Sequence, residues 1–265
     1  MQIAELYAFL GTQALIIAMS VLRISVAFMI LPMFSSQVIP SMVRNALYLS
    51  LALVSILVQA PGSTELPETQ VWIELFAKEA FIGLAIGVFF GLFLWAFEAA
   101  GVVIDMQVGA SFALFQDPIL GNENSPLGSF LGLWASYLFL AAGGLMLFVG
   151  VLMESFAVWP LVQPIDSFNT AAVALFESEF SLFMSLVVRI AGPIIAVLFL
   201  IDISMGLINR YAQNFNVFFL SMSIKAMASV VLLLVLMPFL VDLLLDELYL
   251  HAESTQDLLN LLFLP

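Results

Sequence analysis

The run from Asn124 to Met153, which contains no charged residue, is the feature that most constrains how this chain can fold. About 20 consecutive apolar residues suffice for an α-helix to cross the hydrocarbon core of a bilayer. Over the whole chain, 63% of residues are hydrophobic and only 9% are charged. A soluble domain is roughly half apolar and a quarter charged, so one water-soluble core cannot hold this excess. The sequence therefore predicts an integral membrane or membrane-assembly protein.

Six apolar segments of helical length follow one another along the chain. They cover residues 14–34, 42–60, 73–103, 127–153, 180–201 and 224–241. None shows the alternation of polar and apolar residues, in units of about ten, that is typical of an outer-membrane barrel. The sequence thus predicts an all-α, polytopic membrane protein of helical hairpins that forms one domain over residues 1–265. The third segment is longer than a bilayer core requires, which predicts a tilt or a projection beyond the membrane.

Residue types that carry enzyme chemistry are scarce. The chain has no cysteine, and its one histidine, His251, lies in the acidic tail. A serine nucleophile would therefore have no histidine base inside the apolar segments. Asp105 and Asp202 could be proposed as an aspartyl protease pair, but their surroundings do not match the motifs of that class. The net charge of −13 argues against a basic patch for nucleic acid. We expect no enzyme activity, no cofactor and no metal site.

Two arginines lie inside apolar segments, Arg23 in "MSVLRISVAF" and Arg189 in "SLVVRIAGPII". An arginine at the bilayer centre costs about 2.5–3.5 kcal/mol on insertion scales, so we expect each one to face protein or a water-filled path. A polar link between helices, including helices of partner subunits, is favoured over an ion pathway because no chain of acids accompanies them. Pro193 predicts a kink or break in the fifth segment. Together with the two arginines, it supports a secondary transporter for a small solute as the alternative function.

Small residues recur every four positions in the segments before and after residues 105–126. Such stripes allow the backbone of another helix to come close. The predicted helix-packing residues are Gly83, Gly87, Gly91, Gly128 and Gly132.

The span 200–225 gathers polar groups after an apolar run. Their spacing places Asp202, Met205, Gly206, Asn209 and Gln213 on one helical face. This pattern is consistent either with a solvated helix end or with a subunit interface. The candidate interface residues of the span are Asp202, Arg210, Asn216 and Lys225.

The loop "DMQVGASFALFQDPILGNENSP" (105–126) mixes residues that rarely occur together. A loop in water has no need of Phe112 or Phe115, and a membrane-spanning helix would not tolerate Pro118 beside so many polar groups. Irregular backbone at membrane depth is tolerated where it is buried in protein or lines a wet cavity. The composition therefore favours a protein-lined, partly wet setting, and an ordinary connecting or re-entrant loop is the alternative.

Several stretches, in order along nearly the whole chain, resemble the FliR/SctT family, the export-gate subunits of type III secretion systems. "LRISVAFMILPMFSSQVIPSMVRNALYLSLAL" (22–53) resembles the amino-terminal signature of the family, and "ESF" (154–156) also fits. The loop shares a glycine, a phenylalanine and then "DP", "G" and "SP". The most specific match is "LIDISMGLINRYAQNFNVFFLSMSIK" (200–225). Its matching positions are Asp202, Gly206, Arg210, Asn216, Val217, Phe218 and Lys225.

The resemblance implies a non-enzymatic core subunit of a helical, multi-subunit export gate through which unfolded proteins are exported. The implied partners are FliP/SctR-type, FliQ/SctS-type and FlhB/SctU-type subunits, the exported proteins and membrane lipid, with no nucleic acid. The implied location is the bacterial inner membrane, with multiple crossings and with much of the assembly projecting to the periplasmic side. The short carboxyl tail and the negative net charge slightly favour the injectisome over the flagellum.

The resemblance also implies that this loop is a plug that helps to close the export channel at rest. Our hypothesis is that residues 106–122 project into the pore and obstruct it. The predicted plug residues are Met106, Gly109, Phe112, Phe115, Asp117, Pro118 and Gly121.

Overall fold

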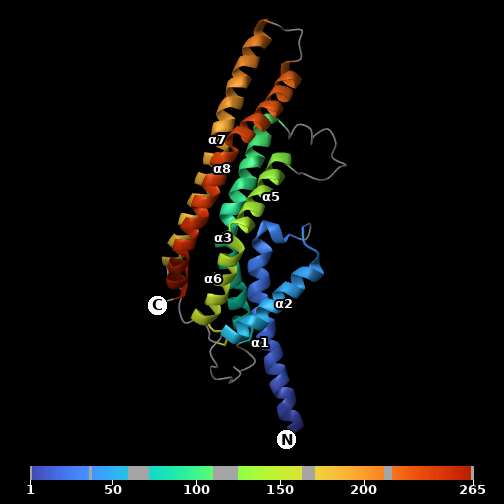
Figure 1. Cartoon of the computed structure of the whole chain (residues 1–265), viewed down its shortest axis with the longest axis vertical. Coiled ribbons are helices and arrows are strands. Elements are labelled where there is room, and N and C mark those ends of the chain that lie inside the picture. The colour runs from blue at the N-terminus through green and yellow to red at the C-terminus, as the bar shows by residue number, and fades with distance from the viewer. Residues whose placement is uncertain are drawn as a thin grey trace. The chain divides into compact units, whose positions relative to one another are not determined.

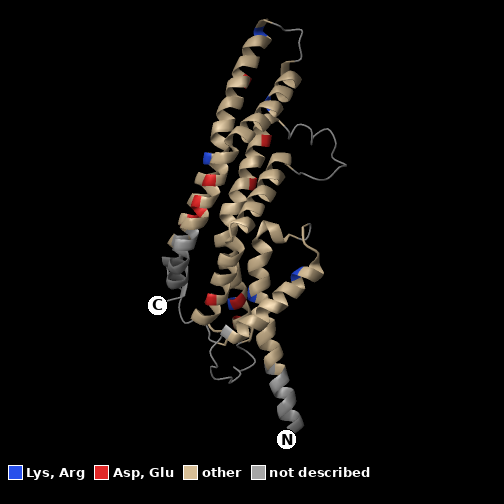
Figure 2. Cartoon of the chain, viewed as in Figure 1, with Lys and Arg blue, Asp and Glu red and all other residues tan. Residues whose placement is uncertain are grey.

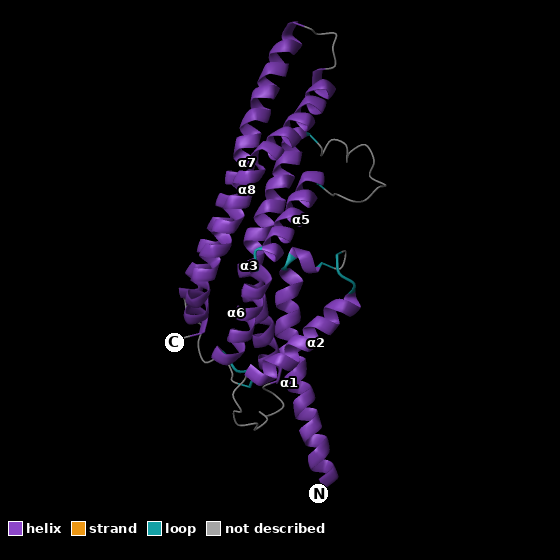
Figure 3. Cartoon of the chain, in the orientation of Figure 1, coloured by secondary structure: helices purple, strands orange, loops and turns teal. Residues whose placement is uncertain are grey.

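The structure is a computed structural model of the chain and describes residues 2–35, 38–58, 72–109, 125–162, 171–211 and 217–263. These residues are almost entirely helical, and no strand occurs among them (Figure 3). The elements are α1 (Gln2–Ile30), η1 (Pro32–Phe34), α2 (Ser41–Val58), α3 (Trp72–Val108), α5 (Pro126–Ala141), α6 (Gly144–Val158), α7 (Ala171–Tyr211) and α8 (Val217–Phe263) (Figure 1). The predicted all-α, polytopic class is confirmed.

Among the described residues, four helices are long and apolar enough to cross a membrane. These candidate spans are Gln13–Ile30, Trp72–Val108, Phe176–Tyr211 and Val217–Leu250. The broken pair of α5 and α6 adds a fifth if it forms a single crossing, whereas α2 is a shorter apolar helix. The six apolar segments thus correspond to four or five candidate crossings. Figure 2 shows how sparse the charged positions are along these helices.

The charge-free fourth segment differs from the sequence expectation because it is two helices. α5 ends at Ala141, and Gly143 then adopts a left-handed conformation with φ of 84° before α6 begins. Glycine reaches this conformation without a steric penalty from a Cβ atom. Pro193 was expected to kink or break the fifth segment, and the break is absent, because α7 continues through it.

Contacts divide the chain into two compact units, although the sequence predicts one domain. Unit 1 holds residues 1–92, 143–179 and 249–265, and unit 2 holds residues 93–142 and 180–248. α3 therefore supplies its first part to unit 1 and its second part to unit 2. Each unit has a core and a set of polar contacts of its own.

The core of unit 1 is built around Phe28 of α1, whose side chain is fully buried. Its ring meets Phe34 of η1 edge-on at a centroid distance of 4.7 Å, and Phe148 of α6 at 4.9 Å. Tyr48 of α2 lies 5.6 Å from the same ring. Pairs of this kind contribute about 0.5–1.5 kcal/mol each beyond their burial, so one phenylalanine joins four elements.

Two glycines of α3 bring its backbone against α1 within unit 1. A Cβ atom on Gly83 would overlap the backbone of Arg23, and one on Gly87 would lie 2.7 Å from the carbonyl oxygen of Ala27. Gly91 is buried in the same helix. At Gly83 and Gly87 the predicted stripe therefore lies where a side chain would force two helices apart.

In unit 2, the second part of α3 packs against α5. Phe93 pairs with Phe139 at a centroid distance of 5.9 Å. A Cβ atom on Gly101 would lie 2.5 Å from the backbone nitrogen of Gly128, a contact that the sequence did not single out. The predicted residue Gly132 is less crowded, because its nearest neighbour is the side chain of Glu98 at 3.3 Å. The unit 2 parts of α7 and α8 run side by side (Figure 1).

The contact at Gly87 gives a direct test of this packing. We expect Gly87→Ala to lower the free energy of unfolding by about 1–3 kcal/mol, because the added methyl group overpacks the contact with Ala27. The matched control is Gly150→Ala in α6, where a Cβ atom meets nothing within 4 Å. That change should be neutral or stabilising by up to about 1 kcal/mol. Thermal unfolding in detergent measures both, and equal midpoints for the two variants would contradict the packing.

Candidate functional site

The guanidinium group of Arg23 is fully buried in unit 1 and has protein partners on two other helices. Its Nε donates to Glu79 Oε2 of α3 at 2.6 Å, and its Nη1 donates to Ser155 Oγ of α6 at 3.1 Å. Its Nη2 donates to the carbonyl oxygen of Trp159 at 3.0 Å. The group also lies 4.1 Å from the ring centroid of Phe156, a favourable cation–π distance. Arg23 thus joins α1, α3 and α6.

A second buried cation shares the same carboxylate. Lys78 Nζ lies 3.0 Å from Glu79 Oε1 and donates to the carbonyl oxygens of Pro160 at 2.8 Å and Leu161 at 3.0 Å. These carbonyls directly follow the carboxyl-terminal end of α6, where the helix dipole is negative. The two cations and the one carboxylate carry a net positive charge. This charge lies against three backbone carbonyl oxygens, those of Trp159, Pro160 and Leu161.

Sequence reasoning found Arg23 but did not find its partners. The available signal was the pair Lys78–Glu79 inside an otherwise apolar run, since such a pair is costly in a membrane-class helix unless it is neutralised. Ser155 and the carbonyls after α6 gave no signal, because their role depends on how α6 lies against α1.

Arg189 differs from Arg23. Its side chain is 57% exposed, and its Nη1 lies 3.9 Å from Glu247 Oε1 across the α7–α8 pair of unit 2. The carboxylate of Glu247 is buried, but at 3.9 Å from a largely exposed guanidinium group this pair contributes little to stability. Much of this guanidinium group is therefore uncovered, although it lies within a candidate span.

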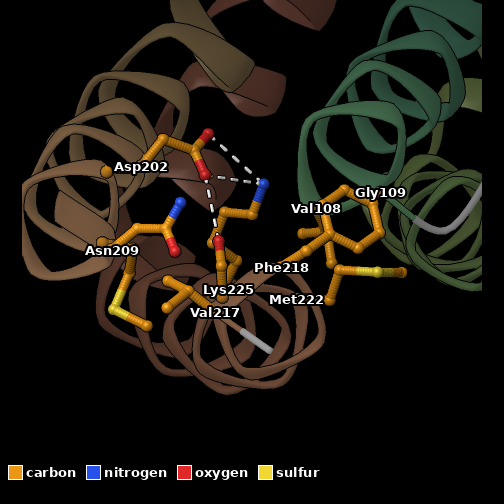
Figure 4. A pocket seen from close by; sticks show the side chains of 11 residues that line it. Val108, Gly109, Asp202, Asn209, Val217, Phe218, Met222 and Lys225 are labelled. Carbon is orange, nitrogen blue, oxygen red and sulfur yellow. Dashed lines mark hydrogen bonds and ion pairs between the residues drawn. The ribbon is translucent and has the colours of Figure 1, made fainter. Parts of the chain in front are cut away.

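The second polar cluster lies in unit 2 and joins α3, α7 and α8 (Figure 4). Lys225 Nζ lies 2.9 Å from Asp202 Oδ1 and donates to the carbonyl oxygen of Gln107 at 2.9 Å. The side chain of Gln107 donates to Asp202 Oδ2 at 3.1 Å, and Ser221 Oγ donates to Asp202 Oδ1 at 3.1 Å. Lys225 is 10% exposed and Asp202 is 33% exposed, so water screens this pair only in part.

A pocket of about 260 Å³ lies beside this cluster (Figure 4). Its lining includes the residues predicted to share one face of α7, apart from Gln213, which lies outside the described residues. The lining residues are Val108, Gly109, Asp202, Met205, Gly206, Asn209, Val217, Phe218, Ser221, Met222 and Lys225. The pocket is mainly apolar, with one ion pair in its wall.

The remaining predicted residues are not part of this cluster or are not described. Arg210 is exposed in the last turn of α7, where a cation is favoured by the helix dipole. Met106 is 61% exposed, and Gly109 follows α3 with φ of 99°. The predicted positions Phe112, Phe115, Asp117, Pro118, Gly121 and Asn216 lie outside the described residues. In the described part of the chain, no cluster of three or more His, Cys, Asp or Glu could hold a metal ion.

The described residues form long apolar helices with buried ion pairs and close helix–helix contacts. These features define a polytopic helical membrane protein. The family of bacterial export proteins, family 1, matches residues 14–250. The chain belongs to this family, and the FliR/SctT resemblance is thereby confirmed.

Named relatives come from both kinds of export apparatus. Yop proteins translocation protein T of Yersinia pestis is 31% identical over 224 residues, covering 82% of this chain and 84% of the relative. Flagellar biosynthetic protein FliR of Bacillus subtilis is 27% identical over 242 residues, covering 91% and 93%. Surface presentation of antigens protein SpaR of Salmonella typhimurium is 29% identical over 228 residues, covering 85% and 84%.

The shared carboxylate of Glu79 should be the most sensitive position of unit 1. We expect Glu79→Gln to lower the free energy of unfolding by about 3–5 kcal/mol, because it leaves two buried cations without their counter-charge. Arg189→Gln is the control, and its cost should be smaller than that of Glu79→Gln, since this pair is long and its guanidinium group is largely exposed. Thermal unfolding in detergent compares the two, and a Glu79→Gln midpoint at or above that of Arg189→Gln would overturn the assignment.

Proposed function

We propose that this protein is a non-enzymatic core subunit of the type III export gate. In this role it helps to form and to close the channel through which unfolded proteins leave the cell. The observation that carries the proposal is the family match over residues 14–250, which covers all but the first residue of the candidate membrane spans found among the described residues.

The low burial of α7 and α8 within this chain supports a multi-subunit assembly. In an apolar 18-residue window of each span, 28% of the residues of α7 and 22% of those of α8 are buried within this chain, against 67% in α3. Lipid could cover apolar residues such as Phe199 and Val235, but it does not suit the half-exposed guanidinium group of Arg189. Partner helices with polar groups would cover both kinds of side chain.

We assign these partner helices to FliP/SctR-type, FliQ/SctS-type and FlhB/SctU-type subunits, on the resemblance to the family. The assembly is proposed to lie in the bacterial inner membrane, with much of it on the periplasmic side. The net charge of −13 favours an injectisome slightly over a flagellum. The translocation protein of Yersinia pestis, at 31% identity, agrees with this preference.

Residues 106–122 are proposed to be the plug of this channel. Their mixture of small, aromatic and turn-forming residues is suited to irregular backbone inside a protein-lined, wet cavity. The transporter alternative is weaker, because α7 continues through Pro193 and so lacks the break at this proline that the alternative invoked.

Shortening the "GASFALF" stretch (109–115) tests the proposed plug. We expect the assembled gate to leak small ions and solutes, because the segment that fills the closed pore is reduced. Potassium release from liposomes that contain the purified complex measures the leak, and native electrophoresis measures assembly. A shortened variant that assembles normally and releases no additional potassium would leave the segment as a connector only.

Arg210 tests the proposed subunit interface. The side chain is exposed, and the described residues give it no ion pair, so we expect Arg210→Glu to leave the isolated subunit stable within about 0.5 kcal/mol. Recovery of the assembled complex should fall several-fold, because a charge is reversed at the interface. Arg189→Glu is not a suitable control, since its neighbour Glu247 would add repulsion within the chain. Unchanged complex yield and secretion in Arg210→Glu would favour a solvated helix end.

A further inference from the structure

The pocket beside the Asp202–Lys225 pair lies entirely within unit 2, where the end of α3 meets α7 and α8. Its volume is about 260 Å³. Pockets that hold small molecules usually enclose about 300–1,000 Å³. A volume just below that range is suited to a single large side chain rather than to a whole ligand.

The charged groups in the wall favour a neutral occupant. The charged lining residues are Asp202 and Lys225, which lie 2.9 Å apart and neutralise each other. The carboxylate also accepts hydrogen bonds from Gln107 and Ser221, and the ammonium group donates to the carbonyl oxygen of Gln107. A charged group brought here would lose its water and find both charges already paired. The occupant therefore carries no charge.

The apolar part of the wall favours an aromatic ring. Met205, Met222 and Phe218 line the pocket, and Figure 4 shows Met222 and Phe218 close together on one side of it. A thioether sulfur makes favourable contacts with an aromatic ring, and a second ring can pair with Phe218 edge to face. On the α7 side, a Cβ atom on Gly206 would meet nothing within 4 Å. A flat ring can therefore pass close to the backbone of this helix.

The amide of Asn209 adds one polar group to this lining. The side chain is exposed, and the part of the chain that the structure describes gives it no hydrogen bond. An amide can both donate and accept. The hydroxyl group of tyrosine and the N–H of tryptophan generally find a partner of this kind when their rings are buried. An acyl chain or an aliphatic side chain would leave the amide without one.

We propose that this pocket is the anchor site for one tyrosine or tryptophan of a partner subunit, whose ring fills the apolar part and whose polar tip bonds to Asn209. The inference rests on the proposed function, because it requires a partner subunit. Arg210, which tests the proposed interface, follows Asn209 directly in the chain. An aromatic residue seated in a pocket is the typical dominant contact of a protein interface.

Blocking the pocket tests the anchor. We expect Gly206→Leu to lower recovery of the mixed complex roughly tenfold or more, because the added side chain occupies the space of a dominant contact. The matched control is Gly192→Leu, at a glycine of α7 that also meets nothing within 4 Å but does not line the pocket. Equal recovery of the two variants overturns the proposal. If the unchanged chain recovers no other membrane protein, the proposed function itself fails.

A photocrosslink identifies the occupant and decides the matter if Gly206→Leu lowers the thermal stability of the isolated subunit. The probe is p-benzoylphenylalanine in place of Phe218, a lining residue that is already aromatic and is 54% exposed. After illumination of intact membranes, mass spectrometry should find it attached to a different membrane protein within one helical turn of a tyrosine or tryptophan. Attachment to lipid, to this chain, to a stretch that lacks both residues, or to nothing overturns the proposal.

Discussion

The buried ion pair between Arg23 and Glu79 determines how the first part of this protein is arranged. Both side chains are fully excluded from solvent. The two residues are 56 positions apart in the chain, and the pair links α1 to α3. Replacing a buried pair by apolar residues is often neutral for stability, whereas removing one partner alone is costly. We infer that the pair acts mainly as a specificity device, because the observed register of α1, α3 and α6 is one that brings Arg23, Glu79 and Ser155 together.

Both units use a buried lysine in the same way. Lys78 binds the carbonyls that follow α6, and Lys225 binds the carbonyl of Gln107 near the end of α3. Each lysine also pairs with one carboxylate, Glu79 or Asp202. Helix ends expose carbonyls that lack partners in their own helix, and a membrane-class protein has little water to satisfy them. A lysine placed there satisfies the carbonyl oxygens of a helix end and is itself neutralised by the neighbouring carboxylate.

Local pattern predicted the helices, the membrane class and the packing glycines Gly83, Gly87 and Gly128, because composition and four-residue spacing are properties of short stretches. Other features depend on how distant helices meet. Glu79 could not be assigned to Arg23 without the register of α1 against α3, and Gly101 lies outside the two stripes that the spacing identified. The break at Gly143 was missed because glycine in an apolar run is also compatible with a continuous helix. Pro193 does not break α7, since a long helix can continue through one missing hydrogen bond.

The central claim is that this chain works as one subunit of a mixed assembly, and the mass of the native complex tests it most directly. The protein would be purified from its own cells in mild detergent with a carboxyl-terminal tag, and the intact complex would be weighed by native mass spectrometry. The account predicts a complex that contains different small membrane proteins in unequal copy number beside this chain. A mass equal to that of this chain alone, or to a whole multiple of it, would contradict the account and would favour a transporter.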